Sequence, residues 1–306
     1  MARGQVSEHA LANQVPRGTR WGKLNDYYEL TKPRIVMLML ITGYTTLWVA
    51  TGTVPPLGLT LVTLLGTALS AGSANALNCY IDRDIDGIMR RTRNRPIPSG
   101  RLTPSEALWF GIITGIVAVA FLAWLANPLA AFWAAFGILF YVFIYTLWLK
   151  RSTPQNIVIG GAAGSVPPLI AWAAATGTVA WPAVVLFLVI FLWTPPHFWA
   201  LALFASEDYQ KVNVPMMPNV HGVEATNRQI IIYTVILTIV SLLLTPLGAT
   251  GWLYFTAAAL AGIYFIILAV RSAKAKDDDH RAAKKLFFYS ILYLAIVFGA
   301  MVIDRQ

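Results

Sequence analysis

Charged residues are scarce in this sequence. Asp, Glu, Lys and Arg make up 12% of the 306 residues, whereas 57% are apolar. A soluble domain is about one-quarter charged, so the composition excludes an ordinary soluble protein and favours one embedded in a lipid bilayer. Lys and Arg outnumber Asp and Glu by 23 to 14. In so apolar a chain, this basic excess indicates orientation in a membrane rather than binding to nucleic acid.

Cysteine is almost absent. Cys79 is the single one, which rules out an intramolecular disulfide and a structural zinc site built from thiolates. The first 34 residues also lack the apolar core of a signal peptide, because charge is spread throughout them. Residues 1–34 are therefore predicted to form a cytoplasmic arm that is not removed.

Long apolar runs are abundant. Nine of them are long enough to cross the hydrocarbon core, about 30 Å thick, as helices. The predicted fold is an all-α polytopic membrane protein, with a nine-helix transmembrane domain over residues 35–303. The predicted spans are 35–54, 57–79, 107–126, 128–149, 155–176, 181–204, 229–248, 251–271 and 285–303.

The connections between these spans alternate in character. Those at 51–57, 127–128, 177–181 and 246–251 carry no charge, whereas the arm and the other four connections hold 22 of the 23 Lys and Arg residues. The positive-inside rule places the arm and the charged connections in the cytoplasm, and the C-terminus outside. The expected location is the bacterial cytoplasmic (inner) membrane, with a site at the cytoplasmic mouth of the bundle.

Two charged connections, 80–106 and 205–228, are too polar to be simple links. Near the first, Asn75, Asn78, Asp82 and Asp86 fall within about 80° of one helical face, and Asp84 points to the opposite side. Two nearby carboxylates at a membrane boundary repel one another and are costly to desolvate. The pattern predicts that a cation neutralises them.

Two kinds of cation fit this face. Hard oxygen ligands without His or Cys suit Mg²⁺, which commonly shares its coordination sphere with substrate phosphates. Arginines suited to binding a diphosphate follow directly, at positions 90, 91, 93 and 95. Alternatively, Asp82 and Asp86 pair with these arginines as a solvated helix end. The loop finishes in a capping box, Thr103 to Glu106, which fixes the start of the third span.

The second polar region follows an interrupted helix. Pro195 and Pro196 are predicted to break the sixth span, and His197 at that break is either a functional residue or a core histidine. The charged cluster from Glu207 to Pro218 could face the Asp82 helix. His221, Glu224 and the acidic run 277–279 are interpreted as exposed loop residues, the last in preference to a metal site.

Several segments between about 30 and 220 resemble the UbiA superfamily of intramembrane prenyltransferases. The Asn78-x3-Asp82-x3-Asp86 motif is specific to that superfamily, and Pro195-Pro196-His197-Phe198-Trp199 and Pro215-Met216-Met217-Pro218 point to its heme-modifying branch. The other matching segments are Leu30 to Arg34, Arg93 to Gly100, Tyr145 to Arg151, Asn156 to Gly164 with Pro167-Pro168, and Asp208-Tyr209.

This resemblance implies an enzyme that transfers the farnesyl group of farnesyl diphosphate to a vinyl group of heme B, with addition of water. It implies Mg²⁺ as cofactor on Asn78, Asp82 and Asp86, with Asp208 as a further catalytic residue. The implied diphosphate ligands are Lys32, Arg34, Arg93, Arg95, Lys150 and Lys211. His197 and Asn156 are assigned to heme. Tyr145 is either a contact to the prenyl cation or a packing residue.

The resemblance also implies partners, namely the bilayer, the two substrates and proteins that handle heme or assemble terminal oxidases. In the second acidic motif, quinone prenyltransferases have paired aspartates, whereas this chain has Asp208-x3-Val212 beside Lys211. Lys211 is therefore expected to meet the diphosphate as a point charge.

Two alternative functions remain. One is a quinone- or chlorophyll-type prenyltransferase, disfavoured by the Pro-Pro-His-Phe-Trp segment. The other is a transporter, which would not explain why carboxylates and arginines gather at one mouth. A purely structural subunit would not explain the costly acidic face.

Overall fold

The computed structural model describes residues 20–275 and 280–305, the side chains of residues 20 and 206–208 excepted. In this part of the chain, nine helical segments are long and apolar enough to cross a membrane, which confirms the predicted count. Eight of them agree with the prediction to within about five residues at each end. The seventh is displaced, because it begins at Met217 and ends at Leu242.

Five spans are single uninterrupted helices. The sixth and seventh spans are helices that each contain one non-helical residue, and the remaining two spans are composite. The single helices are α2 (Pro33–Thr51), α3 (Leu57–Ile81), α5 (Pro104–Leu125), α12 (Trp252–Lys274) and α13 (His280–Ile303). The sixth and seventh are α10 (Trp181–Gln210) and α11 (Met217–Leu242). The fourth joins α6 (Pro128–Leu139), the π-helix η2 (Phe140–Leu149) and α7 (Lys150–Ser152), and the fifth joins α8 (Asn156–Gly164) to α9 (Pro167–Thr176).

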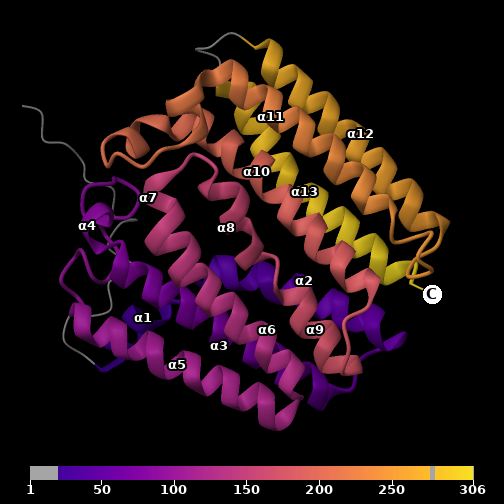
Figure 1. The fold of residues 1–306 in the computed structure, drawn as a ribbon, viewed down its shortest axis with the longest axis horizontal. Helices are drawn as coiled ribbons and strands as arrows, with labels where there is room; N and C mark the ends of the chain where they lie inside the picture. Colours follow the sequence, from indigo (N-terminus) through magenta and orange to yellow (C-terminus); the bar gives the residue numbers. More distant parts are fainter. Residues whose placement is uncertain (1–19, 276–279, 306) are drawn as a thin grey trace, which may run out of the picture.

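The spans lie side by side in one bundle (Figure 1). Helix α3 packs against α5, α10 packs against α11 and α13, and α2 packs against α9. The α8–α9 span is the most buried of the nine and α5 is the least. Large apolar side chains such as Trp109, Ile116 and Trp124 are exposed on α5. Such a surface is stable in contact with lipid and not in water.

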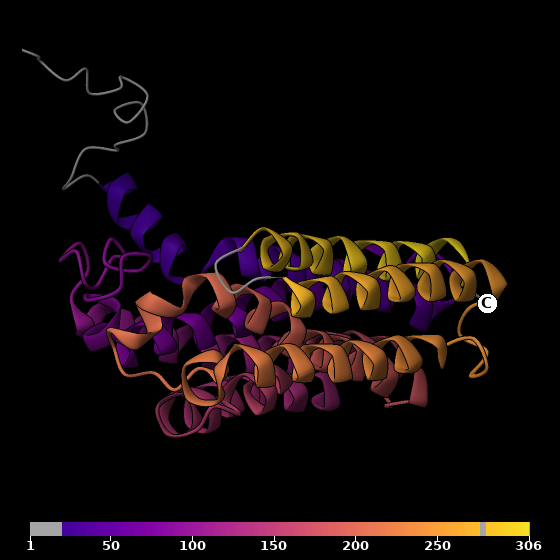
Figure 2. The same cartoon turned by 90° about the horizontal axis from the view of Figure 1, so that it is seen from above.

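The polar connections gather at one end of the bundle. Helix α1 (Arg20–Leu30) and the 87–103 connection lie at this end, and the end of α13 lies at the other (Figure 2). Arg101 joins α1 to the connection, since its guanidinium donates to Asp26 at 2.7 Å and to Glu29 at 2.8 Å. The loop ends in the predicted capping box, in which Thr103 and Glu106 exchange bonds of 3.3 and 2.9 Å. The mouth of the bundle is thereby held in a fixed shape.

A polar contact also closes the opposite end. Asp304, just beyond α13, accepts a hydrogen bond of 2.7 Å from the backbone N–H of Tyr254, in the first turn of α12. The neighbouring Arg305 donates to the carbonyl of Gly52 at 3.2 Å. The last residues described are therefore fastened to two earlier spans.

The predicted break at Pro195 and Pro196 is wrong in its location. The backbone of α10 keeps helical dihedral angles through both prolines, and Ala205 is the residue with non-helical angles. Proline removes a donor but its φ suits a helix, so the neighbouring packing can hold the segment straight. Thr194 adds a hydrogen bond of 2.8 Å to the carbonyl of Ile190 just before the prolines.

Candidate active site

An acidic and amide face continues from the end of α3 into α4 (Arg83–Asp86). Backbone hydrogen bonds of 2.9 Å link Asp82 to Asn78 and Asp86 to Asp82, so the helical register survives the junction between the two helices. Asn75, Asn78, Asp82 and Asp86 are all buried, with Asp82 fully so. The intervening Asp84 side chain is 57% exposed and faces away, as the spacing predicts.

Each carboxylate of this face contacts a basic side chain. Lys150, from the start of α7, donates a hydrogen bond to Asp82 Oδ2. Arg95, from the 87–103 connection, donates to Asp86 Oδ2 at 2.6 Å. The two carboxylates are thus paired with protein cations, as the alternative interpretation of the sequence expects for Asp86 and Arg95. They are buried, however, and do not lie on a solvated helix end.

Lys32 enters the same cluster from the joint between α1 and α2. Its backbone is left-handed, with φ of 55°, and its ammonium group donates to Asn78 Oδ1 at 2.6 Å. Burial lowers the pKa of Lys32, an effect that the carboxylates of Asp82 and Asp86 partly oppose. The unusual backbone of this one residue brings a third cation to the acidic face.

Within the described part of the chain, one oxygen of the cluster has no hydrogen-bond partner. Asp82 Oδ1 is buried, and Arg151 Nη2 lies 3.7 Å from it. A buried carboxylate oxygen without a partner is costly and rare. An oxygen-ligated divalent cation would satisfy it, and the donor set of one amide and two carboxylates suits Mg²⁺. The residues at this face therefore fit the metal that the sequence predicts.

The π-helix η2 completes the wall opposite α3. Thr146 Oγ1 accepts from Asn78 Nδ2 at 3.1 Å and donates to the carbonyl of Tyr141, five residues earlier, at 2.8 Å. Wide π-turns are frequent at functional sites because they redirect side chains. The sequence interpretation missed Thr146 and Tyr141, since the apolar run through them has no signal that distinguishes a π-turn from an α-turn.

Tyr145 lies on the same π-helix and packs against a glycine. A Cβ at Gly160 of α8 would lie 2.1 Å from the Tyr145 ring, so only glycine permits this approach. The ring also stacks on Tyr141, with centroids 5.2 Å apart. The two tyrosines thus form one aromatic surface beside the acidic face.

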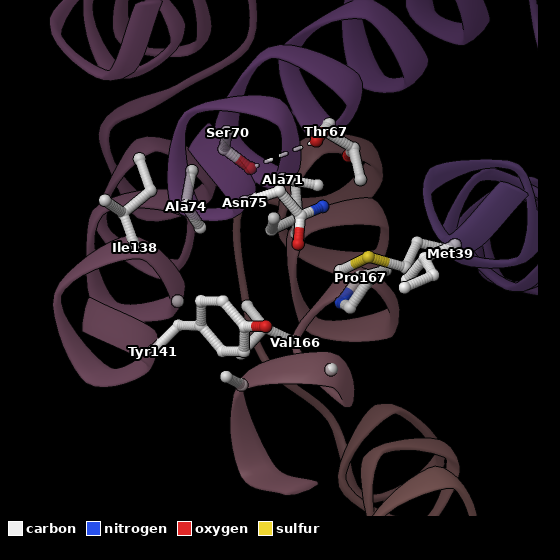
Figure 3. A pocket seen from close by; sticks show the side chains of 16 residues that line it. Met39, Thr67, Ser70, Ala71, Ala74, Asn75, Ile138, Tyr141, Val166 and Pro167 are labelled. Carbon is white, nitrogen blue, oxygen red and sulfur yellow. Dashed lines mark hydrogen bonds between the residues drawn. The ribbon is translucent and has the colours of Figure 1, made fainter. Parts of the chain in front are cut away.

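An apolar cavity lined by residues of α2, α3, α6 and the α8–α9 span lies beside Asn75 (Figure 3). Its volume is about 90 Å³, below the range of about 300–1,000 Å³ typical of small-molecule sites, so a ligand with a long tail would require its lining side chains to shift. Tyr141 points into it, and Met39, Ile138, Val166 and Pro167 line it. A polar mouth above an apolar cavity suits a ligand with an anionic head and a hydrocarbon tail.

The two polar regions predicted to face one another do meet. Arg91, in the first connection, donates a hydrogen bond of 3.1 Å to the hydroxyl of Tyr209, near the end of α10. The side chain of Asp208, predicted to be catalytic, lies outside the described residues. Lys211 is exposed one residue beyond α10. Arg34 and Arg93, both predicted diphosphate ligands, are exposed, unlike the partly buried Arg95.

The two residues assigned to heme have structural partners. Asn156 Nδ2 donates to the carbonyls of Thr153 at 2.7 Å and Pro215 at 3.0 Å, which ties the start of α8 to the segment before α11. His197 Nδ1 lies 2.7 Å from the Ser290 hydroxyl on α13. Its ring is stacked between Trp193 and Phe287, at 4.3 and 4.5 Å.

Comparison with known proteins finds similar sequences that share one name. A protoheme IX farnesyltransferase of Symbiobacterium thermophilum is 53% identical over 92% of this chain and 94% of its own. Another, of Gloeobacter violaceus, is 57% identical over 92% of each. Both relatives are matched over nearly their whole length.

Solved structures show the same fold. A structure of digeranylgeranylglyceryl phosphate synthase superimposes with a TM-score of 0.78 at 23% identity, covering 92% of this chain and 98% of that one. A UbiA homolog from Archaeoglobus fulgidus, bound to GPP and Mg²⁺, gives 0.66 at 15% identity, with 90% and 99% covered. The model of the UbiA prenyltransferase family matches residues 38–292. With this match over most of its length, the chain belongs to the UbiA prenyltransferase family.

Proposed function

We propose that this chain transfers the farnesyl group of farnesyl diphosphate to heme B, giving heme O and diphosphate. The observation that carries the proposal is the identity of more than half with protoheme IX farnesyltransferases along nearly their full length. The acidic mouth above an apolar cavity supports it, because a prenyl diphosphate has an anionic head and a hydrocarbon tail.

The proposed reaction adds a farnesyl carbon and a hydroxyl group to the two carbons of a heme vinyl group. The bond between farnesyl C1 and the diphosphate oxygen breaks, and the electron pair leaves with diphosphate. The allylic carbon then bonds to the terminal carbon of a heme vinyl group, which leaves a cation on the carbon next to the porphyrin. Water adds there and loses one proton, so the product carries a hydroxyethylfarnesyl side chain.

The residues of the acidic face would bind the diphosphate end. Asn78, Asp82 and Asp86 would hold Mg²⁺, which when bound supplies positive charge that stabilises the leaving diphosphate. Lys32, Lys150 and Arg95 lie on this face and are proposed as diphosphate ligands, with Arg34, Arg93 and Lys211 approaching from the exposed rim. Asp208 is proposed to act from the end of α10.

The apolar cavity would bind the isoprenoid tail and exclude water from the first cation. Tyr145 and Tyr141 are proposed to face that cation, since aromatic faces attract positive charge. For heme, His197 and Asn156 are the proposed contacts. Because His197 Nδ1 is engaged by Ser290, Nε2 is the atom that would reach iron or a propionate.

The protein is multi-pass, and its proposed location is the bacterial inner membrane with the mouth toward the cytoplasm. Farnesyl diphosphate would reach the mouth from the water and lipid boundary. Heme B is poorly soluble in water, so heme-handling or terminal-oxidase assembly proteins are the proposed partners for its delivery and removal.

The function is tested by incubating the purified protein with heme B, farnesyl diphosphate and Mg²⁺, then weighing the extracted heme by mass spectrometry. The expected product gains one farnesyl group and one hydroxyl group. Unmodified heme, together with prenylation of 4-hydroxybenzoate offered in its place, would instead assign the chain to the quinone-modifying branch.

A further inference from the structure

Three oxygens of the proposed metal ligands already accept a hydrogen bond from a protein cation, whereas Asp82 Oδ1 has no partner among the described residues. The pairs are Lys32 with Asn78 Oδ1, Lys150 with Asp82 Oδ2, and Arg95 with Asp86 Oδ2. The cations come from three separate parts of the chain, namely the joint between α1 and α2, the 87–103 connection and the start of α7. Three distant segments therefore converge on one short acidic face.

A bound metal would lie close to the ammonium groups of these lysines, and cations at such short range repel one another. Mg²⁺ needs its ligand oxygens at about 2.0–2.1 Å in a near-octahedral arrangement. The ammonium group of Lys32 is 2.6 Å from Asn78 Oδ1, and that of Lys150 is hydrogen-bonded to Asp82 Oδ2. Because of the repulsion, we expect both lysines to move away when Mg²⁺ enters, even where Asp82 binds it through the unpartnered Oδ1. Their long, flexible stems allow such a shift without movement of the backbone.

The net charge of the cluster makes binding of Mg²⁺ depend on binding of the diphosphate. Arg151 and Asp84 pair with one another and cancel, and the remaining charges of the cluster, Asp82 and Asp86 against Lys32, Lys150 and Arg95, sum to one positive charge. Mg²⁺ alone would raise the positive excess to three. A prenyl diphosphate, with roughly three negative charges at neutral pH, would neutralise the cluster if it arrived together with the metal. In a buried site, the neutral combination is strongly favoured.

We propose that Lys32 and Lys150 hold the place of the metal on Asn78 and Asp82 in the empty enzyme and transfer to the diphosphate when both ligands enter. Mg²⁺ and prenyl diphosphate then bind cooperatively, and neither binds well alone. This inference rests on the proposed function, because it concerns the same diphosphate site. It gives the lysines a positioning role for the metal in addition to their contact with phosphate.

The test measures metal binding and not turnover. Mn²⁺, a paramagnetic substitute for Mg²⁺, is titrated into the full-length protein with and without inorganic pyrophosphate, and bound Mn²⁺ is followed by electron paramagnetic resonance. The values are corrected for the Mn²⁺–pyrophosphate complex that forms in solution. We expect pyrophosphate to strengthen Mn²⁺ binding to the unaltered protein by about tenfold or more, a typical size for linked sites.

Lys32→Met removes the cation from Asn78 Oδ1, and Lys150→Met removes the cation from Asp82 Oδ2, which still accepts from Asn78 Nδ2 at 2.7 Å. Both variants should bind Mn²⁺ about tenfold more tightly than the unaltered protein when pyrophosphate is absent, and the strengthening by pyrophosphate should fall below about threefold. Lys274→Met removes an exposed lysine at the end of α12 and should behave as the unaltered protein does. Using two lysine variants keeps the test valid if one of them folds poorly.

The inference is overturned if both lysine variants keep the unaltered coupling, or if they bind Mn²⁺ more weakly without pyrophosphate. Either result can coexist with production of heme O, and the proposed function would then stand. A protein that shows the predicted coupling but leaves heme unmodified would retain the lysine exchange and lose the heme assignment.

Discussion

Asp82 and Asp84 are two positions apart, yet they occupy opposite environments. Asp82 is fully buried with one unpartnered oxygen, whereas the Asp84 side chain is largely exposed and bound by both terminal nitrogens of Arg151 at 2.7 Å. These hydrogen bonds lower the pKa of Asp84 to about 2. A lowered carboxyl pKa stabilises the fold above its unfolded value near 4 and loses that contribution as the pH falls toward 2. Asp84 is thus ionised and forms a surface ion pair with Arg151 throughout the neutral pH range.

The first prediction contrasts these two residues. Asp82→Asn should reduce heme O formation by about 100-fold or more, because it removes charge from the proposed metal ligand set. Asp84→Asn should retain most of the activity. Turnover of both variants is measured by mass analysis of heme, and EDTA should abolish turnover of the unaltered protein until Mg²⁺ is restored. Equal damage at the two positions would contradict the proposed acidic face.

The second prediction concerns His197 and separates packing from chemistry. His197→Phe keeps a ring between Trp193 and Phe287 but removes both nitrogens. If Nε2 contacts heme, this variant should bind heme B at least about tenfold more weakly, as followed by the heme absorption spectrum, with pyrophosphate binding unchanged. Ser290→Ala, which removes only the partner of Nδ1, should have a smaller effect. Normal heme affinity in His197→Phe would make His197 a core residue.

At the scale of elements, hydropathy and capping rules predicted most of the fold. The spans and the Thr103 capping box depend on local composition, which the sequence displays directly. The π-helix η2 could not be predicted, because widening a turn changes a hydrogen-bond register without needing a particular residue. The left-handed Lys32 was missed for a different reason, since tertiary contacts and not residue type impose that backbone. Consequently the sequence predicts that Asn78, Asp82 and Asp86 share one face, but it does not predict that Lys32 and Lys150 bind to that face.

The third prediction tests the close approach of η2 and α8. Gly160→Ala places a methyl group against the Tyr145 ring and should destabilise the protein by roughly 1–3 kcal/mol, because one of the two helices must shift. Gly299→Ala, on α13 with nothing within 4 Å of the added Cβ, should be neutral or slightly stabilising. Thermal unfolding in detergent measures both. Tyr145→Ala combined with Gly160→Ala should recover part of the loss.

The fourth prediction concerns the end of the bundle opposite the mouth. Asp304→Ala removes the side chain that accepts from the first turn of α12 and should cost about 1 kcal/mol. Asp304→Asn keeps an acceptor oxygen and should lose less. The measurement is the free energy of unfolding of each variant. If the two variants lose equal stability, the contribution of Asp304 comes from its charge and not from the hydrogen bond to α12.

At the scale of the whole molecule, the described residues contain an odd number of candidate membrane spans, so the chain enters and leaves the bundle at opposite ends. The mouth, with α1 and the 87–103 connection, lies at one end, and Asp304 and Arg305 lie at the other (Figure 2). Because nearly all Lys and Arg fall in the arm and the connections on the side of the mouth, that side is predicted to be cytoplasmic.

The fifth prediction follows from this orientation. A reporter enzyme fused after Gln306 should be active outside the cytoplasm, and one inserted between α12 and α13 should be active inside. Paired alkaline phosphatase and fluorescent protein fusions give opposite signals on the two sides and provide the check. Identical signals from the two positions would remove one crossing and with it the predicted side of the mouth.

The odd number of crossings counted in residues 20–275 and 280–305 also limits how such a gene can duplicate. If a second copy were joined directly to the end of α13, its first helix would begin on the far side of the membrane. The copy would then insert upside down, with its acidic face open to the opposite compartment, where the charge bias of its loops would resist that orientation. Two working units in a single polypeptide therefore require a linker that itself crosses the membrane an odd number of times.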